Sequence, residues 1–366
     1  MTDQALAKSV MYDVQAAMGA TFTSFWGWIW TESFGDALGE HRAIREGVGA
    51  VDVSSLIEWE WTGPDSLLAA QRLCTNDILG LSIGQIRYGP FLDADGKMID
   101  DGTIWRLGDD RCWVMTNRWD LQEHFAEVTH GLDVTIKDVT LEMPLIQVQG
   151  PRSRELLSKL TSVDLASLKY FRFIPEQVEI GGVPVWIGRT GFTGELGFEL
   201  FVSPADAPGL WSTVVEAGAT PYGTAAANTQ RIESGIVVYE EDYAPGALTP
   251  YDVSWDRLVA LSRDFVGREA LEGLADNPPR RMKTLKLEGE FVPEANATVL
   301  NGDTPVGTLT SPTFSPDFGV IGLAILEAEA AHEGKQLDVV AGDETRLRAA
   351  VHTLPIYDPD RKRPRM

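Results

Sequence analysis

The sequence of 366 residues has little cysteine, no long apolar run and comparatively few basic residues. Its two cysteines, Cys74 and Cys112, are too few for a disulfide framework and indicate reduced thiols in a cytoplasmic protein. Because no run of about 18 apolar residues occurs, no membrane span is predicted. The first residues, MTDQALAKSVMYDV, lack the basic and apolar regions of an export signal, which also favours the cytoplasm.

Histidine is scarce as well, with five residues scattered along the chain. Since neither a CxxC nor an HExxH spacing occurs, no metal site is indicated. The net charge is −23, from 54 acidic and 31 basic residues. Such a surface repels phosphate backbones and anionic lipids, so we expect neither a nucleic-acid nor a membrane partner. The basic last residues, DPDRKRPRM, are interpreted as a solvated end of the chain.

Strand-like and helical segments alternate through the first three quarters of the sequence. IEWEWTG (57–63) alternates bulky and charged residues as a half-buried strand does, and TIWRLGDDRCWVMTN has the pattern of a hairpin. Further strands are expected near 177–188 and 198–203, and helices near 204–217 and 225–235. After the proline-rich linker LADNPPRRMK only strand-like segments remain. This pattern predicts an α+β fold with a C-terminal antiparallel β-barrel or jelly-roll domain.

The segment RTGFTGELGFEL places Glu195 among three glycines, Gly191, Gly194 and Gly197. Glycine is favoured where the backbone turns with positive φ or approaches another group closely. A carboxylate with two acceptor oxygens matches the paired N–H donors of a flat heterocycle such as a pterin or a guanine. Two interpretations therefore stay open, a ring-binding carboxylate or an exposed Glu in a tight turn.

Asp100 and Asp101 stand together in DADGKMIDDGTIW, where a strand is expected to begin. Adjacent residues on a strand face opposite ways, so one of the two carboxylates can point into a site. That carboxylate could accept a proton or hold a cation. A solvated strand edge or a cap is the competing interpretation.

Tryptophan is abundant, and eight of the eleven lie within the first 119 residues. Trp26, Trp28 and Trp30 recur at a period of two, so they would share one face of an extended segment. Aromatic faces stack on planar rings or surround methylated cations, although most of these residues are expected in the core. On the expected helix NTQRIESG, Arg231 and Glu233 point in different directions. Arg231 could bind a carboxylate ligand or form an ion pair.

Six segments, in order along the chain, together resemble the folate-dependent family that includes the glycine-cleavage T-protein (aminomethyltransferase). They are GVGAVDVSSLIEWEWTGPDSLLAAQRLCTNDI, RYGPFLDADGKMIDDGTIW, LIQVQGP, RTGFTGELGFEL, DFVGREAL and GTLTSPTFSPDFGVIGLAIL. The resemblance implies a three-domain cloverleaf with tetrahydrofolate in a central channel. The expected domains are 1–50 together with 140–275, then 51–139, and 284–366.

The resemblance also implies roles for single residues. Glu195 falls on the glutamate that grips the pterin, and Asp101 falls on the second Asp of the family's IDD, near the reacting one-carbon unit. The remaining positions assigned to the cofactor are Tyr88, Asn117, Phe192 and Arg231. Asp101 and Tyr88 are the expected catalytic residues, with Tyr88 also a hydrogen-bond donor.

Four positions depart from the T-protein pattern. Ser55 stands where the family has His, Ala227 and Asn228 replace an Arg-Asp pair, and Ser24 replaces an Asp. The run NTQRIESG is more similar to the demethylase branch, which includes dimethylsulfoniopropionate demethylase and aryl methyl ether O-demethylases. The net charge of −23 would also hinder docking of an acidic lipoyl carrier.

We therefore expect an enzyme that moves a methyl group from a small donor, preferably a methoxyaromatic compound, to tetrahydrofolate. The product would be 5-methyltetrahydrofolate, and Trp26, Trp28, Ser55 and Tyr239 would hold the donor. The alternatives are an aminomethyltransferase of glycine cleavage, a sulfonium demethylase and a folate-binding module without catalysis. Nothing in the sequence indicates the oligomeric state.

Overall fold

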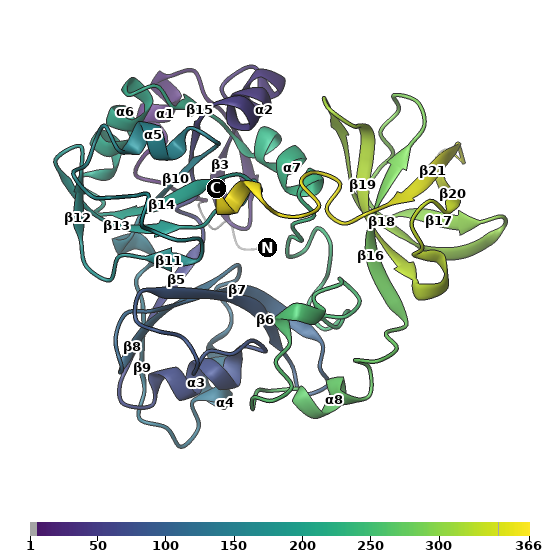
Figure 1. Cartoon of the computed structure of the whole chain (residues 1–366), viewed down its shortest axis with the longest axis horizontal. Coiled ribbons are helices and arrows are strands. Elements are labelled where there is room, and N and C mark those ends of the chain that lie inside the picture. Colours follow the sequence, from purple (N-terminus) through teal and green to yellow (C-terminus); the bar gives the residue numbers. More distant parts are fainter. Residues whose placement is uncertain (1–5, 343) are drawn as a thin grey trace.

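The computed structural model describes residues 6–342 and 344–366 and has three lobes that surround its centre (Figure 1). One sheet of twelve strands runs through two of the lobes. In the first lobe its strands are β4 (Gly49–Asp52), β10 (Leu145–Gln149), β11 (Arg172–Phe173), β12 (Val178–Ile180), β13 (Val183–Arg189), β14 (Gly197–Val202) and β15 (Thr220–Pro221). In the second lobe they are β5 (Ile57–Thr62), β6 (Gln85–Leu92), β7 (Met98–Arg106), β8 (Arg111–Thr116) and β9 (Thr135–Asp138). The two halves join where β11 pairs with β6.

The second lobe forms because its strands alternate apolar and polar residues. Ile57, Trp59 and Trp61 of β5 face one way and pack into a buried cluster with the helices of this lobe. Those helices are α3 (Ser66–Leu73) and α4 (Gln122–Val128). β7 and β8 pair antiparallel from Thr103 onward, which confirms the predicted hairpin.

The first lobe covers its half of the sheet with helices and carries a small extra sheet, β1–β3–β2. These elements are β1 (Ala7–Lys8), α1 (Tyr12–Ala17), β2 (Thr21–Phe25), β3 (Trp28–Ser33), α2 (Ala37–Glu46), α5 (Ser153–Leu157), α6 (Ala207–Glu216) and α7 (Thr224–Glu233). The short helix η1 (Thr140–Glu142) packs instead on β5 of the second lobe, where Glu58 N donates to Thr140 Oγ1. The segment that contains Trp26, Trp28 and Trp30 is a hairpin rather than one extended strand. Trp26 (φ 48°) and Gly27 (φ 75°) form its turn. The expectation of one shared face is therefore wrong, because glycine at position 27 makes the positive φ of a tight turn inexpensive.

The third lobe is a closed antiparallel barrel of order β16–β19–β18–β17–β20–β21. Its strands are β16 (Arg280–Leu287), β17 (Ala297–Asn301), β18 (Thr304–Ser315), β19 (Gly319–Glu327), β20 (Gln336–Val340) and β21 (Arg346–His352). Between α7 and the barrel lie η2 (Asp256–Leu258) and α8 (Arg268–Glu272), and η3 (Ala328–Ala330) follows β19. The predicted fold class is confirmed, and the C-terminal domain is a barrel. The predicted domain boundaries stay a prediction.

After β21 the chain leaves the barrel and returns to the first lobe, where η4 (Arg363–Arg365) lies near the C-terminus (Figure 1). Cys74 and Cys112 are buried and unpaired. In the part of the chain that the structure describes, no helix combines the length and the apolar character needed to cross a membrane.

Candidate active site

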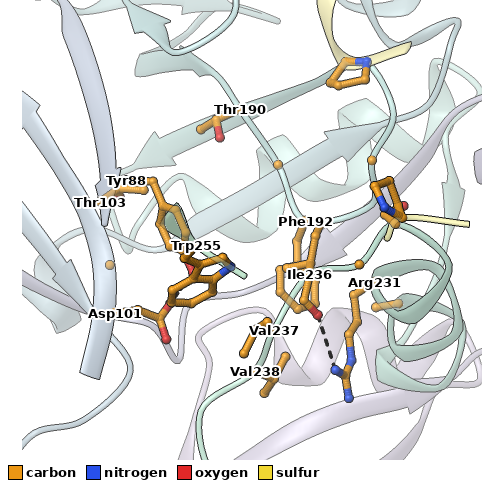
Figure 2. A pocket seen from close by; sticks show the side chains of 18 of the residues that line it. Tyr88, Asp101, Thr103, Thr190, Phe192, Arg231, Ile236, Val237, Val238 and Trp255 are labelled. Carbon is orange, nitrogen blue, oxygen red and sulfur yellow. Dashed lines mark hydrogen bonds between the residues drawn. The ribbon is translucent and has the colours of Figure 1, made fainter. Parts of the chain in front are cut away.

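A cavity of about 1880 Å³ lies where the three lobes meet. Its lining comes from the β2–β3 hairpin, β4, β6, β7, β10, β14, α7, η2 and the C-terminal segment. Tyr88, Trp255, Asp101, Phe192 and Arg231 all line this cavity (Figure 2). Residues far apart in the sequence thus reach a common space.

Asp101 is the carboxylate of the Asp pair that lines the cavity, and its side chain is buried at 7% exposure. The Tyr88 hydroxyl donates to Asp101 Oδ2 at 2.7 Å, and the Tyr243 hydroxyl donates to Oδ1. Asp100 instead accepts a 2.8 Å hydrogen bond from Asn117 Nδ2. Strand alternation in β7 thus separates the two carboxylates as the sequence predicts.

Burial raises the pKa of both carboxyls in this pair. For Asp100 burial is the main cause, the charge of Asp101 adds to it, and the pKa rises to about 8. For Asp101 burial also raises the pKa, whereas the hydrogen bonds from Tyr243 and Tyr88 lower it. The pair therefore has one group that readily keeps its proton at neutral pH and one whose anion is stabilised by hydrogen bonds.

Glu195 is buried, and protein groups occupy both of its oxygens. Oε1 accepts from Arg45 Nη1 at 2.9 Å and from the Tyr357 hydroxyl at 2.5 Å, and Oε2 accepts from Arg363 Nε at 2.7 Å. Arg363 and Tyr357 belong to the C-terminal segment. The expectation that DPDRKRPRM is a solvated end is therefore wrong, since a buried carboxylate attracts this segment into the molecule.

The glycines around Glu195 have a packing role. A Cβ on Gly191 would lie 2.0 Å from Gln149 Oε1, and one on Gly197 would lie 2.2 Å from the same atom. Gly194 has φ +77°, and a Cβ there would lie 2.1 Å from Ser234 Oγ. The small residues thus admit Gln149 and Ser234, which pack against the turn.

Glu199 is a cavity residue that the sequence analysis missed. It lies on β14, is 8% exposed, and accepts a 2.7 Å hydrogen bond from Gln147 Nε2 through Oε1. Its Oε2 has no hydrogen-bond partner among the described residues, and burial raises its pKa to about 7. The buried hydroxyl of Tyr222, which also lines the cavity, has no partner within the described chain. The sequence feature that could have indicated Glu199 is that it is the only charged residue in the otherwise apolar strand GFELFV.

Arg231 lines the cavity, but its guanidinium donates to protein groups on every side. Nη1 donates to Asp242 Oδ2 at 2.5 Å and to the Ile236 carbonyl at 3.3 Å, the bond drawn in Figure 2. Nη2 donates to Glu241 and to Ser311 Oγ. Arg231 therefore fixes the segment that follows α7 and the adjacent barrel strand β18. Glu233, which diverges from it as predicted, pairs with Arg45.

The predicted donor-binding residues do not all reach the cavity. Trp26 lines it, but Trp28 is buried and stacks on Trp119 with ring centroids 6.3 Å apart. Ser55 lies with Trp28 at a separate pocket of only about 10 Å³. Tyr239 packs against Trp26 at 5.6 Å without lining the cavity. The predicted cofactor residues Tyr88, Asn117, Phe192, Glu195 and Arg231 do line it, as do the departing positions Ser24, Ala227 and Asn228.

The fold and this site together are those of a folate-dependent one-carbon transferase. The family model of the GCVT N-terminal domain matches residues 11–263, and that of the glycine cleavage T-protein C-terminal barrel domain matches residues 280–358. The chain therefore belongs to the glycine-cleavage T-protein family. Family membership confirms tetrahydrofolate as the cofactor.

Similar proteins extend over the whole chain. The aminomethyltransferase of Streptomyces avermitilis is 36% identical, over 91% of this chain and 93% of its own. That of Rubrobacter xylanophilus is 35% identical, over 98% of this chain and 96% of its own. The crystal structure of glycine cleavage system aminomethyltransferase T from Bartonella henselae has a TM-score of 0.88 at 25% identity, covering 97% of this chain and 99% of that one.

These similarities correct the expected reaction. The prediction of methyl transfer from a methoxyaromatic donor is wrong, because the relatives that cover the chain are named aminomethyltransferases. The expectation that a net charge of −23 hinders docking of an acidic carrier stays a prediction. The cavity lining carries both signs of charge, with basic residues such as Arg257 and Lys283 and acidic residues such as Asp101 and Glu199.

Proposed function

We propose that the protein transfers the one-carbon unit of an aminomethyl group to tetrahydrofolate and releases ammonia. The main support for this proposal is that two buried carboxylates with different partners, Glu199 and Asp101, line one cavity. Glu199 has an oxygen open to a ligand, whereas both oxygens of Asp101 are held by phenols. These environments suit two tasks, binding of a ring and stabilisation of a reacting group.

The ring site is proposed at Glu199 rather than at Glu195. Glu199 Oε2 and the Tyr222 hydroxyl have no partner among the described residues, and Gln147 Nε2 donates to the other oxygen of Glu199. An acceptor oxygen, an amide and a hydroxyl suit the donor and acceptor edge of a pterin. Tetrahydrofolate supplies the nitrogen atoms that accept the one-carbon unit. The Glu199 carboxylate would bind the ring's N–H groups in its ionised form.

Asp101 is proposed to act on the donor. As an anion it would stabilise the positive charge of an aminomethyl group and orient that group, or would accept a proton during transfer. The surrounding Tyr88 and Trp255 rings, with centroids 5.5 Å apart, would limit the access of water. Trp26 lies at the same cavity and offers an aromatic face to the donor.

The partners are proposed to be tetrahydrofolate and an aminomethyl donor, carried in the simplest case on a lipoyl group. As the carbon bonds to N5 and N10, its carbon–sulfur and carbon–nitrogen bonds break, so the carrier leaves as a thiol and the nitrogen as ammonia. The acidic surface supports the absence of nucleic-acid and membrane partners, and the two unpaired cysteines support a cytoplasmic location.

Product analysis tests this function. The protein is incubated with tetrahydrofolate and an aminomethyl-lipoyl carrier, and ammonia and the folate product are measured. We expect ammonia and 5,10-methylenetetrahydrofolate, with little product from an Asp101→Ala variant. Binding of tetrahydrofolate without either product would contradict the proposal and favour a folate-binding module.

A further inference from the structure

We propose that Tyr243 is a positioning residue of the reaction centre, which holds the Asp101 carboxylate in place from behind the cavity wall. Only the expected effect on kcat rests on the proposed function, because the position of the carboxylate does not depend on which reaction takes place. The contact itself is a hydrogen bond from the Tyr243 hydroxyl to Asp101 Oδ1. No sequence motif pointed to this residue, which stands 142 positions away from Asp101.

The two phenols bind different oxygens of Asp101 and come from different parts of the fold. Tyr88 lies on β6, beside the strand that carries Asp101, and its ring lines the cavity. Tyr243 follows α7, is 3% exposed and packs in an apolar cluster with Leu92 and Met98. Because Tyr243 does not line the cavity, it acts on the substrate only through Asp101.

The backbone around Tyr243 is fixed by the segment that precedes it. The Tyr243 carbonyl accepts a 2.8 Å hydrogen bond from Glu240 N, and its ring lies 5.8 Å from that of Tyr239. The adjacent Asp242 is fully enclosed by donors from two other elements. It accepts from Arg231 of α7 at 2.5 Å and from Ser311 of β18 at 2.6 Å. Arg231 and the barrel thereby set the place from which Tyr243 reaches Asp101.

The hydrogen bond from Tyr243 affects the pKa of Asp101 in one direction. Burial raises the pKa of Asp101, and each phenol hydrogen bond opposes that rise because it stabilises the anion. The other titratable, charged or polar groups that act on the Asp pair are Tyr239, Asp242, Asn117 and Arg118, in addition to Asp100 itself. Asp242 is acidic, and its charge also raises the pKa of Asp101. Removal of the Tyr243 hydroxyl would therefore raise the pKa of Asp101 further.

The test is the Tyr243→Phe variant, which keeps the ring and removes the hydroxyl. We expect the acid limb of the pH–kcat profile to move to higher pH and kcat at neutral pH to fall about tenfold or more, as for a lost hydrogen bond to a charged group. The KM for tetrahydrofolate should stay within about twofold, because the ring site is elsewhere. Tyr251→Phe is the matched control, since Tyr251 is buried in the same apolar cluster and donates to neither Asp.

A direct titration of the carboxyl separates this proposal from the proposed function. Infrared or carbon-13 spectra of the wild type, with Asp101→Asn to assign the band, report the ionisation of Asp101 without any turnover. A titration that moves to higher pH in Tyr243→Phe but not in Tyr251→Phe supports the inference even if aminomethyl transfer fails. Identical Asp101 titrations in the wild type and Tyr243→Phe would overturn it.

Discussion

Glu195 and Glu199 stand four positions apart in one motif, yet they meet different surroundings. Two arginines and a tyrosine surround Glu195, so its charge holds parts of the protein together. Glu199 receives one amide hydrogen bond and faces the cavity. The number of unoccupied acceptor sites, rather than the residue type, decides which glutamate is available to a ligand.

Glu199→Gln should weaken tetrahydrofolate binding about tenfold or more at pH 8, because it removes the charge from hydrogen bonds to the ring. Burial raises the pKa of Glu199 to about 7, so the wild-type carboxylate is ionised above that pH and protonated below it. Wild-type affinity should thus fall as the pH drops through 7, whereas the affinity of the variant should change little. Calorimetry at pH 6 and pH 8 measures both, with exposed Glu179→Gln as the control. Equal affinities of wild type and variant at pH 8 would exclude Glu199 from the ring site.

At the scale of elements, alternation made β5, the β7–β8 hairpin and the division between Asp100 and Asp101 predictable from sequence. The turn at Trp26 was not predictable by periodicity, since a period of two continues through a tight hairpin turn. Tyr243 and Arg363 could not be assigned either, because their contacts with Asp101 and Glu195 join segments 142 and 168 positions apart. Local patterns carry no information about which distant segments meet.

Strand β5 contains a buried carboxyl that should reduce stability. Glu58 is fully buried and neither of its oxygens has a partner among the described residues. Burial, aided by the charges of Asp138 and Glu199, raises its pKa well above the ordinary value. At pH values between the pKa of Glu58 in the unfolded state and its higher pKa in the folded state, only the folded protein keeps the Glu58 proton. The free energy of unfolding therefore falls as the pH rises through this range.

Replacement of Glu58 by Met should therefore raise the free energy of unfolding, by about 1–3 kcal/mol near pH 8, and by less near pH 5. Urea unfolding at the two pH values measures this difference. A variant that is less stable than the wild type at pH 8 would mean that Glu58 has a stabilising role.

The C-terminal segment should depend on its ion pair with Glu195. Arg363→Ala removes the 2.7 Å contact with Oε2 and should increase hydrogen exchange from Tyr357 onward, with a loss of about 1–3 kcal/mol in local stability. Lys362→Ala is the matched control, since its partner Asp360 is exposed and such pairs contribute little. Equal exchange in both variants would contradict an anchoring role for Arg363.

For the whole molecule, three lobes surround one cavity whose lining carries both acidic and basic side chains. Each lobe contributes part of the site, with Glu199 from the first and Asp101 from the second, and with Ser311 of the barrel bonded to Arg231. The family signatures in the sequence predicted this architecture and the cofactor. They did not predict the donor. At positions such as Ala227 the chain lacks the family's usual residue, and the sequence does not show which group binds the donor instead.

The central claim is that carbon passes from an aminomethyl donor to tetrahydrofolate within this cavity. A single turnover with donor labelled by carbon-13 in the aminomethyl carbon, followed by NMR of the folate, tests this claim most directly. We predict that the label appears in the methylene bridge between N5 and N10 of tetrahydrofolate, and that Asp101→Ala greatly slows its appearance. Label that stays with the donor while tetrahydrofolate is bound would contradict the account.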